Sequence, residues 1–252
     1  MPVDPLALAL AVAGILIGGL MKGATGAGAP VVAVPMLAVA FDVPTAVAIF
    51  TIPNLLSNGW QSWQYRAHQV PAGFTRAFAM AGVAGAGIGT FVLVSVPSAL
   101  LEGVAALVIC AYIAFRFARP GWQLNLSAAQ RIVWPIGTAA GVLQGAIGVS
   151  APISVTFLSA MRLDRLQFVA TIAIFFLSMS LIQIPMMAAF GLLTPHVALL
   201  GLGAFVLVVA AMPVGGLLGR RLPPWAFDWL VLGLLAVVAI RLASSAVTHA
   251  SG

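Results

Sequence analysis

Charged residues are scarce in this sequence. Only 6% of its 252 residues are Asp, Glu, Lys or Arg, whereas 62% are hydrophobic, and the mean hydropathy is +1.15. A soluble domain cannot cover that much apolar surface with so little charge, so we predict a polytopic all-α membrane protein whose main partner is the lipid bilayer. The net charge of +6 comes mainly from arginines in predicted loops, which orient membrane proteins, so nucleic-acid binding is not expected.

Groups that catalyse reactions or bind metals are also rare. The single cysteine, Cys110, excludes an internal disulfide and argues against a metal or redox centre. All carboxylates fall in predicted loops or near the ends of predicted spans, which argues against a buried proton relay and against a hydrolytic acid–base pair. The histidines, in turns and near the C-terminus, form no metal set. We predict no enzymatic activity, no cofactor and no metal. The carboxylates are Asp4, Asp42, Glu102, Asp164 and Asp228.

One Gly-rich stretch occurs twice. Lys22–Pro30 reads KGATGAGAP and Gln144–Pro152 reads QGAIGVSAP, with Gly, Ala, Gly, Ala and Pro at matching positions. Both copies interrupt apolar segments, and lipid tolerates such breaks only where the freed backbone groups line a protein cavity. The offset of 122 residues also aligns other pairs, including Val47 with Val169. The sequence therefore predicts an internal duplication whose two breaks form the two halves of one binding site.

Each half is predicted to follow the same plan. Residues 1–118 form the first repeat, 119–131 a polar linker and 132–252 the second repeat. The first repeat contains a broken hairpin at 6–41 and transmembrane helices at about 46–65, 77–96 and 100–117. The second contains a broken hairpin at 132–161 and transmembrane helices at about 168–190, 197–218 and 225–242.

Loop arginines discriminate between two topologies. If each broken segment crossed the membrane once, the arginines would be divided between both sides. If each break is the tip of a re-entrant hairpin, every loop arginine except Arg241 lies on one side, as the positive-inside rule requires. Three full crossings per half then make the repeats inverted, which is a transporter architecture, and place both termini in the periplasm. The first five residues lack Lys and Arg, so the first apolar segment is expected to be retained.

In this topology the two tips are expected to meet near the middle of the membrane. Helices beginning at Pro30 and Pro152 would aim free N–H groups at an anion, and the glycines would allow close backbone approach. The alternative is a pair of kinks that serve close helix packing. The candidate substrate-binding residues at the breaks are Lys22, Gly23, Thr25, Gly26, Gly28, Pro30, Gln144, Gly145, Gly148, Ser150 and Pro152.

Polar side chains also mark the helix that follows each hairpin. Asn54, Ser57, Asn58 and Gln61 share one helical face, and the second half carries Gln183 at the position of Gln61. A wet pathway would explain this stripe, as would hydrogen bonds between helices. We include Asn54, Asn58, Gln61 and Gln183 among the candidate substrate-binding residues.

Lys22 is the only lysine in the chain and adjoins the first break. A charge at that depth is costly unless it faces a cavity or a partner, so it is a candidate counter-charge for an anionic substrate. The alternative is a side chain that extends to the membrane interface. The second copy has neutral Gln144 at this position, which would make the site asymmetric.

These motifs resemble the sulfite exporter TauE/SafE family of bacterial membrane transporters. The resemblance covers nearly the whole chain and rests on the duplicated Gly-rich segment, with Pro35 and Leu37 after its first copy, and on two Gly-xxx-Gly pairs, at 85–89 and 215–219. In Ala27-Gly28-Ala29 the sequence departs from the run of glycines that the family often has. The resemblance implies transport of small sulfur-containing anions, such as sulfite or organosulfonates, across the inner membrane, often as export.

The sequence thus predicts a multi-pass protein of the bacterial inner membrane that exports small anions by alternating access. Two alternatives stay open: a permease for another small solute such as a carboxylate, and a membrane scaffold or assembly factor that transports nothing. Homo-oligomerisation also stays open.

Overall fold

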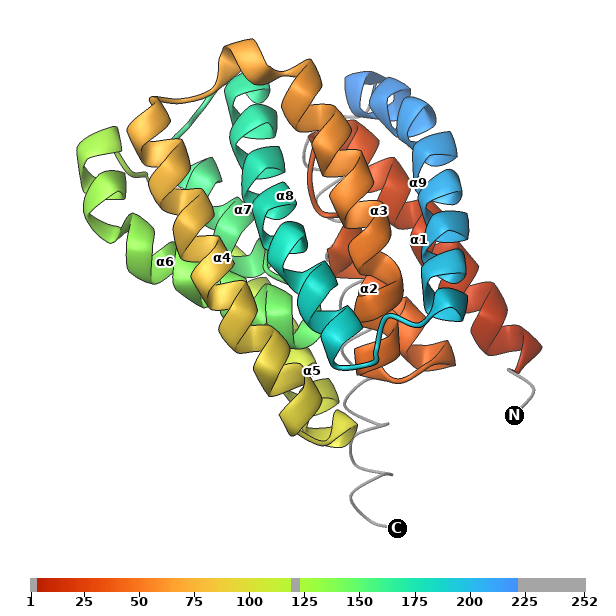
Figure 1. Cartoon of the computed structure of the whole chain (residues 1–252). Helices are drawn as coiled ribbons and strands as arrows, with labels where there is room; N and C mark the ends of the chain where they lie inside the picture. The colour runs from red at the N-terminus through yellow and green to blue at the C-terminus, as the bar shows by residue number, and fades with distance from the viewer. Residues whose placement is uncertain (1–3, 119–122, 222–252) are drawn as a thin grey trace.

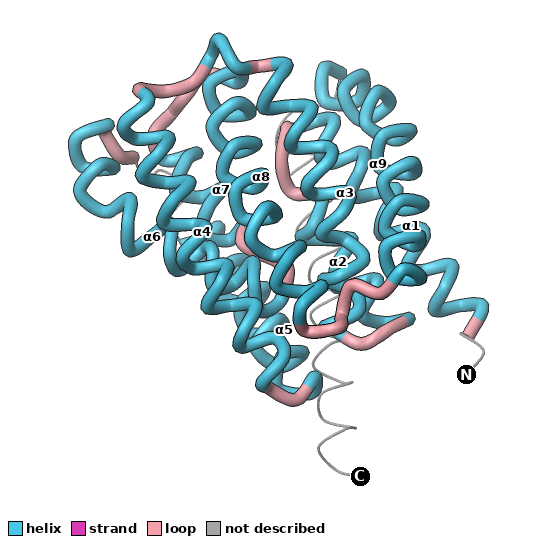
Figure 2. Tube along the Cα trace, in the orientation of Figure 1, coloured by secondary structure: helices cyan, strands magenta, loops and turns pink. Residues whose placement is uncertain are grey.

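The computed structural model describes residues 4–118 and 123–221. Within these residues the chain forms nine α-helices and one 3-10 turn, joined by short loops and without strands (Figures 1 and 2). This confirms the predicted all-helical fold. The α-helices are α1 (Pro5–Thr25), α2 (Ala29–Ala40), α3 (Val43–Gln64), α4 (Ala72–Ser95), α5 (Ser98–Ala118), α6 (Leu126–Ile147), α7 (Ala151–Ala160), α8 (Arg165–Ala189) and α9 (Pro195–Arg221), and the 3-10 turn is η1 (Arg66–His68).

Five of the described helices are long and apolar enough to cross a membrane: α1, α4, the Ser98–Phe115 part of α5, α8 and α9. With 22 residues α3 has a similar length, but polar residues make it less apolar. The helices α3, α4, α5, α8 and α9 cover the transmembrane segments predicted at 46–65, 77–96, 100–117, 168–190 and 197–218. The segment predicted at 225–242 lies outside the described residues.

Both Gly-rich breaks are the tips of helical hairpins. A Cβ atom added at Gly14 of α1 would lie 2.5 Å from Met36 Cβ, and one added at Gly18 would lie 3.2 Å from Ala33 Cβ, so α1 and α2 run antiparallel. In the second hairpin, the N–H of Leu124, just before α6, donates to the carbonyl of Ala160 at the end of α7 (2.8 Å). The chain therefore returns from each tip to the level at which it entered.

The entering arms are longer than the apolar runs from which they were predicted. Helix α1 continues through the first part of the Gly-rich stretch to Thr25, and α6 begins at Leu126, inside the predicted linker at 119–131. Asn125 starts α6 because its side chain accepts a hydrogen bond from the N–H of Ala128 (2.8 Å). The first turns of α6 contain polar residues, so hydropathy alone does not place the start of the helix at Leu126.

The long arm of each hairpin packs against a helix of the other half. Added Cβ atoms at Gly85 and Gly89 of α4 would lie 2.9 and 2.8 Å from the Cα atoms of Gly141 and Gly145 in α6. At Gly219 of α9 an added Cβ would lie 2.9 Å from Ala24 Cα in α1. Small residues one turn apart permit these contacts between backbones. Helix α4 is the second α-helix after the first hairpin, and α9 is the second α-helix after the second hairpin. The two interfaces therefore join equivalent helices of the two halves.

Helices α3 and α8 lie side by side at the centre of a row formed by α4, α8, α3 and α9 (Figure 1). They run antiparallel, since Asn54 Nδ2 donates to Ser180 Oγ (3.2 Å) and Thr51 Oγ1 lies 3.7 Å from Met187 Sδ. Many of the buried polar side chains lie on or near this pair, including Asn54, Asn58 and Gln183.

Gly89→Ala is expected to destabilise the fold. The new methyl group would overlap the carbonyl oxygen of Val142 and come within 2.8 Å of Gly145 Cα, and backbone cannot rotate away as a side chain can. Overpacking of this kind costs about 1–3 kcal/mol. The unfolding midpoint in detergent should fall, whereas Gly103→Ala in α5, where no atom lies within 4 Å, should leave it unchanged or raise it. Equal midpoints for the two variants would contradict the close α4–α6 contact.

Candidate functional site

The first tip ends one helix and starts the next within three residues. Gly26 has φ +83°, and its N–H donates to the carbonyl of Lys22 (2.7 Å), which terminates α1. Gly28 has φ +90°, and Pro30 lies in the first turn of α2, where a missing N–H removes no hydrogen bond. Thr25 Oγ1 lies 2.9 Å from the carbonyl of Met21 and 2.7 Å from that of Ala27. The two positive φ angles are the reason that this stretch needs glycine.

The second tip has the same construction with one difference. Gly148 has φ +71°, and its N–H donates to the carbonyl of Gln144 (2.9 Å). Ser150, at the position of Gly28, precedes α7 but does not cap it. Its hydroxyl instead donates to Gln144 Oε1 (3.1 Å) and lies 3.4 Å from Ser154 Oγ.

Each tip packs against helices of the other half, and the meeting of the tips near the middle of the membrane stays a prediction. A Cβ at Gly26 would overlap Val169 Cγ2 near the start of α8, and a Cβ at Gly148 would lie 3.1 Å from Val47 Cγ2 near the start of α3. Because α3 and α8 are antiparallel, these contacts lie near opposite ends of the pair.

The tips nevertheless occupy equivalent places. Val47 and Val169 are themselves related by the offset of 122 residues, as Gly26 and Gly148 are. Each tip thus packs against the matching valine of the other half. The two breaks therefore make two equivalent contacts, each with a different helix.

Lys22 is the charged group at the centre of the described fold. Its side chain is 2% exposed, and its ammonium donates to Asn58 Oδ1 at 2.6 Å. Asn58 Nδ2 donates in turn to the carbonyl oxygen and Oδ1 of Asn54 (2.7 and 2.8 Å), and Asn54 donates to Ser180 of α8. No carboxylate among the described residues pairs with Lys22. The ammonium is therefore buried with neutral partners, and the side chain does not extend to the membrane interface.

Asn58→Leu is expected to destabilise the protein because it removes the acceptor from this buried ammonium. An unsatisfied buried donor costs about 1–3 kcal/mol, and more when it is charged. The unfolding midpoint should fall, and adding Lys22→Met to the same chain should restore part of the loss. A double variant no more stable than Asn58→Leu alone would show that the cost comes from packing around residue 58.

The remaining candidate glutamines lie in the same interface. Gln61 of α3 is 4% exposed and Gln183 of α8 is fully buried. Gln183 Nε2 donates to the carbonyl of Gln144 (3.4 Å), whereas the Oε1 atoms of Gln61 and Gln183 have no hydrogen-bond partner among the described residues. These two equivalent residues place one unpartnered amide oxygen in each half of the interface.

The structure thus gathers most of the polar candidates into one buried strip, which we call the polar seam. Eight of the fifteen candidates lie elsewhere or serve the backbone. Gly23 packs against Met212 of α9, Gly145 against Ala86 of α4, Thr25 bonds the tip, and Pro152 borders an apolar pocket. The other four form the helix ends at the tips: Gly26, Gly28, Pro30 and Gly148. Two seam residues were missed as candidates, Ser154 and Ser180. Ser154 follows Ser150 by one helical turn, which is the signal that could have identified it. The seam consists of Lys22, Asn54, Asn58, Gln61, Gln144, Ser150, Ser154, Ser180 and Gln183.

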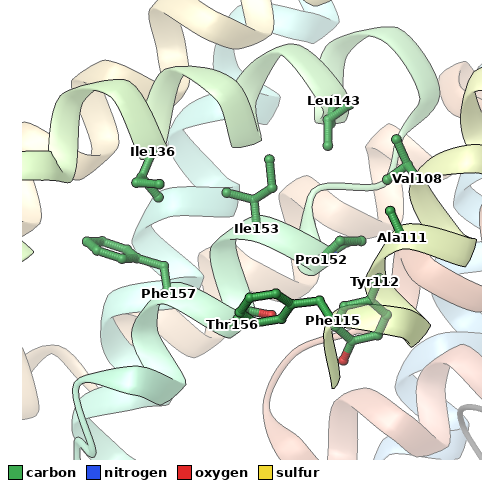
Figure 3. Close-up of a pocket in the computed structure, with 10 residues that line it drawn as sticks. All are labelled: Val108, Ala111, Tyr112, Phe115, Ile136, Leu143, Pro152, Ile153, Thr156 and Phe157. Carbon is green, nitrogen blue, oxygen red and sulfur yellow. The ribbon is translucent and has the colours of Figure 1, made fainter. Parts of the chain in front are cut away.

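The apolar pocket lies between α5, α6 and α7 and has a volume of about 410 Å³ (Figure 3). Side chains such as Phe115, Ile153 and Phe157 line it, and Tyr112 and Thr156 bring the hydroxyl groups at its wall. Since the wall carries no charged group, the pocket does not suit an anion.

The described carboxylates lie near helix ends, but one of them is buried. Asp4, Asp42 and Asp164 accept N–H bonds at the starts of α1, α3 and α8. Glu102, about one turn into α5, is only 4% exposed, which the sequence argument did not anticipate. Asp228 lies outside the described residues.

An arginine from the second half contacts the end of the first arm. Arg165, the first residue of α8, donates from Nη2 to the carbonyls of Ala24 (3.3 Å) and Gly23 (3.5 Å). These carbonyls belong to the last turn of α1, whose partial negative charge favours a cation. The equivalent residue of the first half is Val43, so the second tip has no such contact.

Comparison with known proteins gives one match. The family model described as "Sulfite exporter TauE/SafE" matches residues 10–242, nearly the whole chain. No curated protein and no solved structure matches.

Proposed function

The chain belongs to the sulfite exporter TauE/SafE family of membrane transporters, and from this premise we propose that it exports small anions, sulfite or organosulfonates, across a bacterial inner membrane. The proposed counter-charge for the anion is Lys22. Transport proceeds by alternating access about the α3–α8 interface, with both termini on the periplasmic side.

The single observation that carries the anion proposal is the burial of the Lys22 ammonium beside Asn58 with no carboxylate partner among the described residues. A buried ion of this kind is stabilised by an opposite charge, and removing it from water without one costs several kcal/mol. An anionic substrate supplies the missing charge during each cycle. Asn58 bonds the ammonium directly, and Asn54 and Ser180 extend this chain of hydrogen bonds. Asn54 Nδ2 donates one hydrogen to Ser180 and retains a second for an oxygen of the anion.

The helix directions support inverted repeats. Helices α1 and α9 run parallel, as do α6 and α4, whereas the equivalent helices α3 and α8 run antiparallel to each other. A two-fold axis in the membrane plane, between α3 and α8, would exchange these contacts, and it would relate Gly26 on Val169 to Gly148 on Val47. Transporters with this symmetry alternate by exchanging the conformations of their two halves.

The membrane potential supports export. An anion leaving a negative-inside cell gains about 2.3 kcal/mol per charge per 100 mV. Export of sulfite or a sulfonate can therefore proceed on the electrical gradient alone. In vesicles, initial rates of export should rise with an imposed potential, and rates insensitive to it would contradict the electrogenic form of this proposal.

The test of substrate class is the unfolding midpoint of the purified protein in sulfite, thiosulfate, sulfonates, sulfate and short carboxylates. A ligand present at a hundred times its dissociation constant adds about 2.7 kcal/mol to the free energy of unfolding. A rise with a sulfur oxyanion supports the proposal, and a rise only with carboxylates would identify a carboxylate permease. No rise with any anion would contradict an anion site and favour a scaffold.

A further inference from the structure

The second tip carries a cluster of oxygens that the anion proposal does not explain. Gln144, Ser150, Ser154 and Gln183 come from α6, from the break, and from α7 and α8, and none of their side chains is more than 4% exposed. Their polar atoms lie within 3.0–3.4 Å of one another or of the adjoining backbone. The cluster is one turn along α8 from Ser180 and contains no charged group.

Both hydroxyl hydrogens of this cluster and one amide N–H already have acceptors. Ser150 donates its hydroxyl hydrogen to Gln144 Oε1, and Ser154 donates to the carbonyl of Ser150 (3.0 Å). Gln183 Nε2 donates to the carbonyl of Gln144, and because a carbonyl can only accept, this bond fixes the orientation of the Gln183 amide. Neither hydroxyl group has a hydrogen left for an anion, so only the remaining amide N–H groups of Gln144 and Gln183 could donate to one.

Oxygen lone pairs are also left over. Gln183 Oε1 is fully buried and has no partner among the described residues, and both serine oxygens retain lone pairs. The carbonyls that end α6 add the negative end of a helix dipole at the same break. Excess oxygen lone pairs without a carboxylate favour a monovalent cation, since divalent cations in proteins take carboxylate ligands as a rule.

The first half of the chain carries a cation at the position of Gln144, although Gln61 Oε1 there has no partner among the described residues either. Gln144 corresponds to Lys22, whose ammonium is a covalently attached monovalent cation bound to Asn58 Oδ1. The second half has no such built-in cation. In transporters with discontinuous helices, the unwound segment and the C-terminal end of a half-helix coordinate coupling ions.

We propose that the second break binds an alkali metal cation, Na⁺ or K⁺, through the oxygens of Gln144, Ser150, Ser154 and Gln183. The bound ion takes the role that the Lys22 ammonium has in the first half. Its site is separate from the proposed anion site, so it can be tested without any substrate.

The experiment follows the unfolding midpoint of the purified full-length protein while NaCl or KCl replaces choline chloride at constant ionic strength, with no sulfur anion present. The midpoint should rise saturably with Na⁺ or K⁺ and stay constant in choline. Ser154→Ala, which removes one oxygen and keeps α7 intact, should abolish the rise. The matched control is Ser178→Ala on α8, because that hydroxyl bonds the carbonyl of Phe175 outside the cluster and its loss should leave the rise intact.

A second variant tests the comparison between the two halves. Gln144→Lys supplies an ammonium at the second break and should make the midpoint independent of Na⁺ and K⁺. The proposal is overturned if choline stabilises the protein as well as the alkali ions do, or if Ser154→Ala keeps the full rise. Because no anion enters the assay, this result stands apart from the anion panel, and either proposal can fail without the other.

Discussion

Lys22→Gln is expected to abolish both the stabilisation by sulfur anions and their transport. The substitution removes the one buried ammonium of the polar seam and gives the first break the residue that the second break already has, Gln144. A hydrogen bond to a charged group contributes about 1.5–3 kcal/mol, so anion affinity should fall about ten- to a hundred-fold. The measurements are the anion-dependent shift of the unfolding midpoint and the initial rate of anion flux in vesicles.

The matched control keeps the charge. Lys22→Arg retains a cation at the same position, although the guanidinium is larger, and should preserve part of the anion response. A Lys22→Gln protein that transports at the normal rate would contradict the role of this ammonium. Loss of transport in both variants, with normal anion binding, would indicate that residue 22 acts in the conformational change instead.

Asn58→Asp offers a test in the opposite direction. It places a carboxylate where Asn58 Oδ1 accepts from Lys22, so the protein would carry its own counter-charge. The midpoint without added anion should therefore rise, whereas anions should produce no further increase. This combination distinguishes a charge effect from damage to the fold, because a damaged protein would be less stable under both conditions.

The duplicated breaks could be predicted from the sequence because glycine and proline act on the local backbone. The positive φ angles of Gly26, Gly28 and Gly148 place helix ends where the pattern of glycines predicts them. The burial of Lys22 and the shared face of Asn54 and Asn58 also follow from local arguments, namely the depth of the residue and the helical period.

The packing of the tips could not be predicted in this way. It depends on how far α1 and α6 extend into and beyond the apolar runs, and on which helix of the other half each tip contacts. Contacts such as Gly85 with Gly141, or Gly26 with Val169, join residues far apart in the chain, and neither residue carries a chemical sign of its partner. The buried position of Glu102 has the same cause, since burial near a helix end depends on neighbours that hydropathy does not identify.

This geometry changes what a mutation at a tip should do. Gly26 packs against Val169 of α8, and Gly148 packs against Val47 of α3 and Val34 of α2. The two reciprocal contacts are not equally tight. An added Cβ at Gly26 overlaps Val169, whereas one at Gly148 lies 3.0 Å or more from its nearest neighbours on Val34 and Val47. The first tip is therefore the more sensitive of the two.

Gly26→Ala should reduce transport more strongly than Gly148→Ala. Both variants impose a left-handed backbone conformation on alanine, which costs about 1–2 kcal/mol. Only Gly26→Ala adds a steric overlap, which costs about 1–3 kcal/mol more. If this strain falls mainly on one of the two transport states, each 1.36 kcal/mol changes the rate about tenfold. Initial rates at equal amounts of membrane-inserted protein make the comparison.

Val169→Ala separates the two causes. In the Gly26→Ala background it removes the overlapping methyl groups but leaves the backbone strain. The double variant then has the same strain as Gly148→Ala and should transport at about the same rate. Val169→Ala alone should have a small effect, because Gly26 presents no side chain to it. If the double variant were as slow as Gly26→Ala, the backbone conformation alone would limit transport. The contact between Gly26 and Val169 would then serve only to pack the hairpin.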